Sequence, residues 1–133
     1  NHNAPHCHSY QKVKNVLNNE SKGVYQGKIF VKNIAQKTDA YQLSKALILE
    51  DAAEFDAKPE LEIYADDVKC SHGSTSGSID LDSIHYLKSR GIPANEAFKM
   101  LINGFLGEIL EKLSEGKLKN FLKEKLERQI NGH

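Results

Sequence analysis

Residues 61–75, LEIYADDVKCSHGST, place a thiol and an imidazole two positions apart, at Cys70 and His72. The segment opens with apolar Leu61 and Ile63 alternating with polar neighbours, which is typical of a β-strand. Because residues i and i+2 of an extended strand point to the same face, we expect the thiol and the imidazole to lie side by side. Such a pair suits a soft or borderline metal ion. The alternative is a buried cysteine next to a polar histidine at the end of a strand.

The strand-like pattern extends through most of the chain, from residue 10 to about residue 79. Short apolar groups recur about every 15–20 residues, with turn residues between them and no helical period. This pattern favours either the stacked strands of a solenoid or a β-sandwich. Within it we expect Gly27 to mark a tight bend, Pro59 to open a strand, and residues 73–78 to form a glycine- and serine-rich turn.

From residue 80 onward the apolar residues follow a helical spacing. Asp80 or Asp82 can cap a short helix that stops at Gly91, and Pro93 suits the first turn of a longer helix. The apolar arc of the longer helix is broad, so we expect it to be covered on two sides. The chain therefore divides into a strand region, residues 1–80, and a helical region, residues 81–133.

A last amphipathic helix is predicted after a break near residues 114–116. Lysines and glutamates cover most of it, and its apolar stripe consists of Leu118, Phe121, Leu122 and Leu126. Two interpretations remain open. The helical region could cap the open end of the strand region, or it could form a docking surface for a partner.

Composition narrows the function classes. The 133 residues include 18 basic and 18 acidic side chains, so no general electrostatic attraction to nucleic acid or to an anionic membrane is expected. No apolar run approaches the roughly 18 residues that a membrane helix needs. The two cysteines, Cys7 and Cys70, lie far apart and form no disulfide framework, which favours a reducing cytoplasm. Because the chain starts at Asn1 without a methionine, we expect it to be the C-terminal piece of a longer protein.

The N-terminus also holds several metal-binding side chains close together in the sequence: His2, His6, Cys7 and His8. They resemble half of a zinc site. However, neighbouring residues alternate in direction in an extended chain, and no second pair of ligands follows at the spacing of a zinc finger. A metal site at the N-terminus is therefore the weaker interpretation.

Five segments occur in a fixed order over about residues 1–92. They are HNAPHCHSYQKVKNVL, SKGVYQGKIFV, AQKTDAYQLSKALIL, KPELEIYADDVKCSHGST and HYLKSRGI. In these segments the chain resembles the SufB/SufD family, the scaffold subunits of the Suf iron–sulfur cluster assembly machine. The KCSHG motif with Cys70 resembles the SufD type, and the SufB type is the alternative.

The resemblance implies a fold and a set of partners. The implied fold is the end of a right-handed parallel β-helix, capped by a helical subdomain. The implied role is a scaffold without enzymatic activity, which pairs with a SufB-type subunit and can pair with itself when SufB is absent. The C-terminal helical region, with Leu118, Phe121 and Leu122, would bind SufC, an ABC-type ATPase.

The resemblance also implies a shared site at the SufB–SufD interface. His72 matches the motif histidine of SufD and is the first candidate ligand, with Cys70 second. A cysteine-ligated cluster normally needs four thiolates, and this chain has two cysteines. We therefore expect no cofactor to be bound stably by this chain alone, and only transient iron or a transient cluster in the assembled complex.

Two other function classes remain as alternatives. In a cysteine hydrolase, Cys70 would be the nucleophile and His72 the base, with Asp66 or Asp67 orienting the imidazole. A carbohydrate-binding β-helix would need aromatic platforms, and the chain contains no tryptophan.

Overall fold

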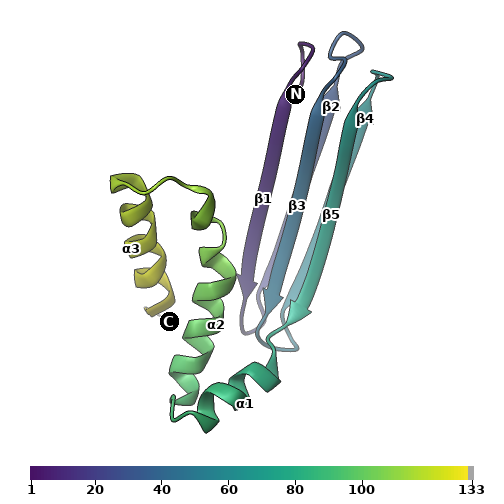
Figure 1. Cartoon of the computed structure of the whole chain (residues 1–133). Coiled ribbons are helices and arrows are strands. Elements are labelled where there is room, and N and C mark those ends of the chain that lie inside the picture. Colours follow the sequence, from purple (N-terminus) through teal and green to yellow (C-terminus); the bar gives the residue numbers. More distant parts are fainter. Residues whose placement is uncertain (132–133) are drawn as a thin grey trace. The chain divides into compact units, whose positions relative to one another are not determined.

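The computed structural model of the chain describes residues 1–131. Two compact units are present, Asn1–Gly77 and Ser78–His133. The first is built from strands and the second from helices (Figure 1). The strands are β1 (His8–Leu17), β2 (Lys22–Val31), β3 (Asp39–Ile48), β4 (Glu54–Ile63) and β5 (Lys69–Ser78). A mainly β fold with a helical C-terminal part is thus confirmed.

Successive strands alternate between two open sheets. One sheet has the order β1-β3-β5 and the other the order β2-β4. The β1–β3 and β2–β4 pairs are parallel, with His8 opposite Asp39 and Lys22 opposite Glu54. The chain therefore returns to the same sheet at every second strand. Each strand contributes one apolar group. One return to the same sheet therefore spans two apolar groups in the sequence.

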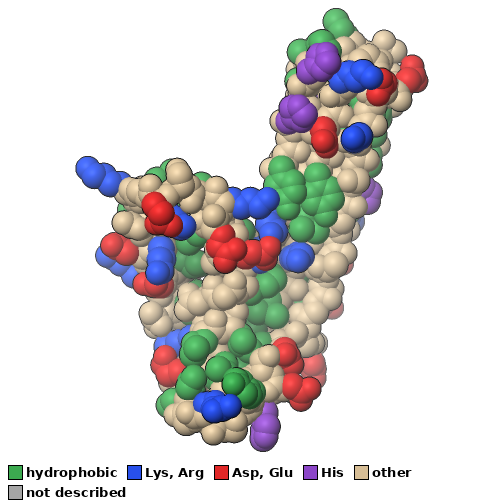
Figure 2. All heavy atoms as spheres, viewed as in Figure 1, with side chains coloured by type: hydrophobic (Ala, Val, Ile, Leu, Met, Phe, Trp, Pro, Cys, Tyr) green, Lys and Arg blue, Asp and Glu red, His purple; other side chains and the backbone are tan. Residues whose placement is uncertain are grey.

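In each sheet, side chains that lie opposite each other on neighbouring strands interact. The rings of Tyr10 and Tyr41, which are opposite each other in β1 and β3, stack with their centroids 5.3 Å apart. In the other sheet, Lys22 Nζ lies 3.0 Å from a carboxylate oxygen of Glu54. Such cross-strand pairs stabilise one register over others. On the face shown in Figure 2, basic and acidic side chains are interspersed and do not separate into regions of one sign.

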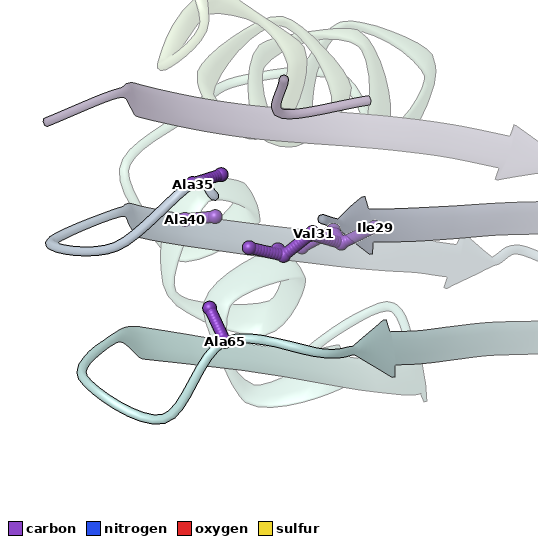
Figure 3. Packing of buried hydrophobic residues seen from close by; sticks show 5 residues of the cluster. All are labelled: Ile29, Val31, Ala35, Ala40 and Ala65. Atoms are coloured by element: carbon purple, nitrogen blue, oxygen red, sulfur yellow. The ribbon is translucent and has the colours of Figure 1, made fainter. Parts of the chain in front are cut away.

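The core of the strand unit is made of small side chains. Ile29, Val31, Ala35, Ala40 and Ala65 form one buried cluster (Figure 3). Val31 and Ala35 have no exposed surface at all. Most members of the cluster are alanines, which allows the strands and the connections between them to approach closely. The partly buried Val68 and Cys70 pack against this cluster.

Three local predictions for the strand unit are wrong. Gly27 does not mark a bend but lies inside β2, where the amide of Gln42 occupies the space of a side chain. Pro59 does not open a strand but lies within β4, at the edge of its sheet, where a missing N–H is tolerated. Residues 73–78 are not a turn but the second half of β5, because pairing with β3 outweighs the weak strand propensity of serine and glycine.

The helical unit contains α1 (Leu81–Ser89), α2 (Ala94–Gly107), a short 3-10 helix η1 (Leu110–Lys112) and α3 (Lys117–Asn131). Asp80 caps α1, since its side chain accepts a hydrogen bond of 3.0 Å from the backbone N–H of Asp82. Gly91 follows α1 with a φ of +88°, as a helix end favours. α2 contacts both α1 and α3, which agrees with its broad apolar arc. No helix within residues 1–131 is both long and apolar enough to cross a membrane.

Candidate functional site

The position of β5 beside β3 decides what surrounds the predicted site. The backbone N–H of Lys69 donates to the carbonyl of Thr38 at 2.8 Å. The equivalent bond between β1 and β3 joins the N–H of Asp39 to the carbonyl of Cys7. It is the first bond of that strand pair, in which Asp39 lies opposite His8. By the same geometry, Lys69 lies opposite Asp39. Since β3 and β5 are equal in length, the two strands run side by side from end to end.

This register places Cys70 opposite Ala40 and His72 opposite Gln42. A Cβ atom added to Gly73 would lie 3.3 Å from a methyl carbon of Leu43, as the same register requires. Cys70 and His72 lie on one face of β5 but in different environments. Cys70 packs against the core cluster, whereas His72 is exposed.

The environment of Cys70 disfavours its thiolate. Burial raises the pKa of the Cys70 thiol, the nearby Asp39 carboxylate raises it further, and a backbone hydrogen bond from Ala40 opposes both effects. The thiolate is the form that attacks substrates or binds metals. A raised pKa therefore counts against a cysteine hydrolase. Asp67, one of the residues proposed to orient a catalytic imidazole, pairs instead with the Lys37 ammonium.

Two of the four metal-binding side chains at the N-terminus, those of His2 and Cys7, make other interactions. The imidazole Nε2 of the nearly buried His2 lies 2.9 Å from the hydroxyl oxygen of Ser9, and the Cys7 thiol donates to the carbonyl of Ala4 at 3.1 Å. Among residues 1–131, no group of three histidine, cysteine, aspartate or glutamate side chains could hold a metal ion. The fold thus brings Cys70 and His72 onto one face, and within the described residues it does not gather the candidate ligands at residues 2–8 into a metal site.

The structure divides the apolar stripe predicted on α3. Leu118 and Phe121 are 63% and 59% exposed, and the ammonium of Lys125 lies 5.9 Å from the centre of the Phe121 ring. Leu122 and Leu126 are half-buried and line a groove of about 270 Å³ together with residues of α2 and η1. The lining residues from that side are Leu106, Ile109 and Leu110. Leu122 therefore packs within the unit, and Leu118 and Phe121 form its exposed surface.

Gln42 is a polar residue of this region that sequence reasoning missed. It is 1% exposed, and its side-chain Nε2 donates to the hydroxyl of Tyr25 in the facing sheet. Its Oε1 is buried and makes no hydrogen bond with any described residue. Gln42 lies opposite Gln11 of β1, and the register inferred from the Lys69–Thr38 bond places it opposite His72 of β5. No local pattern in the sequence indicates these neighbours.

Comparison with known proteins supports the resemblance that the sequence motifs suggested. The family described as SUF system FeS cluster assembly, SufBD core domain, matches residues 1–105. Over 131 residues the chain is 41% identical to the iron-sulfur cluster assembly protein SufD of Escherichia coli (strain K12), covering 98% of this chain and 31% of that protein.

Two further relatives agree with this similarity. One is the iron-sulfur cluster assembly SufBD family protein slr0076 of Synechocystis, which is 39% identical over 122 residues, or 92% of this chain and 27% of that protein. The other is the iron-sulfur cluster assembly protein SufD of Bacillus subtilis, which is 34% identical over 115 residues, or 86% and 26%. The chain spans about a third or less of the length of these relatives.

Proposed function

Since this chain belongs to the SufBD core-domain family and is SufD-like, we propose that it is part of a scaffold subunit of the SUF iron–sulfur cluster assembly system. The observation that carries the proposal is the family match over residues 1–105, which includes every strand together with Cys70 and His72. In this proposal the chain has no catalytic residue of its own. The ATPase and the sulfur donor are partners, and the compartment is the cytoplasm.

The proposal includes the architecture of the parent protein. The strands alternate between two facing sheets and return to the same sheet at every second strand, as in the coils of a solenoid. We infer that they are coils of a right-handed parallel β-helix and that the helical unit caps its end. β5 is an edge strand of its sheet, and edge strands offer backbone N–H and C=O groups to a partner.

The proposed site lies on such an edge strand, β5, and is completed by SufB. His72 is exposed on the edge strand β5, so a ring nitrogen can reach iron without any rearrangement of the strand. Cys70 is the second ligand candidate. Because burial raises the pKa of its thiol, metal binding at Cys70 would have to displace the proton. Iron or a cluster would then be held transiently, with the other ligands coming from SufB or from small thiols.

The helical unit is proposed to dock the SufC ATPase. Leu118 and Phe121 are exposed apolar side chains on one helix, α3, which has no buried residue. An amphipathic helix that offers its apolar side chains to a groove is a recurrent mode of protein recognition. Leu122 supports this surface from within the unit.

The site is tested by co-purification of the full-length protein with SufB and SufC, followed by anaerobic analysis of iron and sulfide. His72→Ala is expected to leave the complex assembled and to lower its iron and sulfide content. His85→Ala is the matched control, because His85 is also an exposed histidine but lies on α1. Normal cluster yield and rate in His72→Ala complexes would show that His72 is not a ligand.

The docking surface is tested with the same complex. Phe121→Asp is expected to weaken SufC binding, and Leu81→Asp is the control, since Leu81 is an exposed apolar residue on another helix. A folded Phe121→Asp protein with normal affinity for SufC would refute docking at Phe121. For the pairing with SufB, sedimentation of a strict monomer at high concentration together with failure to capture SufB would be the refuting result.

A further inference from the structure

We propose that Gln42 is a positioning residue for His72: its buried side-chain carbonyl accepts the N–H of the imidazole, so that the other ring nitrogen is directed to the metal. This inference rests on the proposed function of His72 as an iron ligand. It adds a residue from β3 that does not touch the metal itself.

The register of β3 and β5 brings the two side chains together. Gln42 lies on the inner face of β3, between the buried Ala40 and Ser44. His72 lies opposite Gln42 on β5, and neighbouring strands of a sheet are about 4.8 Å apart. In parallel strands in register, opposite side chains lean in the same direction, so an amide and an imidazole can meet edge to edge.

The amide of Gln42 is held in one orientation. Its Nε2 donates to the hydroxyl of Tyr25, and the space that it occupies exists because residue 27 is a glycine. A Cβ atom at Gly27 would overlap Nε2 of Gln42 and lie 2.5 Å from the Tyr25 hydroxyl. Because the nitrogen is committed to Tyr25, the remaining polar atom of the amide is Oε1.

Oε1 of Gln42 is a buried acceptor with no hydrogen bond to any described residue. Buried polar atoms in folded proteins are nearly always paired, so this unpaired acceptor calls for a donor. The side chain next to it on the edge strand is His72, and a neutral imidazole carries one N–H donor and one acceptor nitrogen. The donor that Oε1 needs is therefore available on its immediate neighbour.

This arrangement fits the chemistry of a metal-bound histidine. Histidine ligands usually donate their second ring N–H to an oxygen acceptor, which fixes the tautomer and the orientation of the ring. An amide oxygen does so without adding a negative charge. The partner of Gln42 on its other side, Gln11 of β1, is exposed and is one strand farther from β5, so it cannot reach His72.

The test uses the full-length protein assembled with SufB and SufC. Gln42→Met keeps the length of the side chain and removes its hydrogen-bonding atoms, and it is expected to lower iron affinity about 10- to 100-fold, as for other supporting partners of metal ligands. Gln42→Glu keeps an acceptor and is expected to retain most of the affinity, with Tyr25 as donor. Gln11→Met is the matched control and is expected to leave iron affinity unchanged.

A double-mutant cycle shows whether Gln42 acts through His72. In a His72→Ala background, Gln42→Met is expected to cause no further loss of iron. An equal loss in both backgrounds would overturn the inference. A second readout needs no metal: in the assembled apo complex with ¹⁵N-labelled histidine, Gln42→Met is expected to change the tautomer ratio of His72, and an unchanged ratio would also overturn it.

The two proposals fail in different ways. If His72→Ala leaves iron retention unchanged, the proposed role of His72 as a ligand fails, and the inference that rests on it falls with it. If His72→Ala lowers iron retention while Gln42→Met behaves as the wild type, the ligand role stands and only the positioning role of Gln42 is refuted.

Discussion

The strand unit and the helical unit differ in where they place their apolar side chains. In the strand unit, Val31 and Ala35 are completely buried, and the strands of two sheets surround the core. In the helical unit, α3 has no buried residue, and Leu118 and Phe121 remain exposed. Both units also expose apolar side chains, among them Val24 and Ile34 in the strand unit. The difference is that the strand unit encloses a buried cluster, whereas every apolar side chain of α3 is at least partly exposed, which fits the docking role proposed for that helix.

The largest expected effect is the loss of a core side chain in the strand unit. Ile29→Ala is expected to lower the free energy of unfolding by about 2–5 kcal/mol, because Ile29 is 6% exposed and its truncation leaves a cavity. Phe121→Ala in α3 removes an exposed ring and should change the free energy by no more than about 0.5 kcal/mol. Denaturant titration of both variants measures the contrast. Similar losses in the two variants would mean that the helical unit packs Phe121 as a core residue.

A smaller loss is expected at Gly27, where the Gln42 amide already fills the space of a Cβ atom. Gly27→Ala should destabilise the protein by about 1–3 kcal/mol, because the new methyl group displaces the Gln42 amide from Tyr25. Gly77→Ala is the control in β5, since its Cβ atom would meet nothing within 4 Å. Thermal or denaturant unfolding distinguishes them, and equal stability of the two variants would contradict the close contact at Gly27.

The opposite sign is expected for a glycine of the helical unit. Gly104 lies in the interior of α2, and a Cβ atom there would meet nothing within 4 Å. Gly104→Ala should therefore stabilise the protein by up to about 1 kcal/mol through helix propensity alone. A loss of stability in the isolated protein would show that close packing requires this glycine. Normal stability with weaker SufC binding would instead place Gly104 at the docking surface.

The smallest effect concerns the alkaline limb of the stability curve. Burial raises the pKa of Cys70 above its ordinary value of 9.0, so the folded protein holds this proton more tightly than the unfolded chain. The resulting stability is complete below about pH 9 and is lost as the pH rises through the folded pKa. Cys70→Ala should remove this part of the alkaline decline, as denaturant titrations from neutral to alkaline pH would reveal. If the free energy of unfolding falls equally with pH in both proteins, the Cys70 thiol is exposed to water and burial does not raise its pKa.

Local features were visible in the sequence because they depend on neighbouring residues. Asp80 and Gly91 marked the ends of α1, since a cap and a left-handed turn are set by the residue at that position. The period of two in an extended chain likewise put Cys70 and His72 on one face. The spacing of the apolar groups indicated a series of short strands, and five motifs indicated the family.

Only the tertiary structure decided what lies beside those residues. The register between strands that are distant in the sequence placed Gln42 next to His72 and packed Cys70 against Ala40. At Gly27, where a bend was predicted, the Gln42 amide occupies the space of a side chain. The same pairing converted residues 73–78 from a predicted turn into a strand. These neighbours are determined by hydrogen bonds and side-chain contacts between strands. The register differs from one strand pair to the next, and no local pattern in the sequence indicates it.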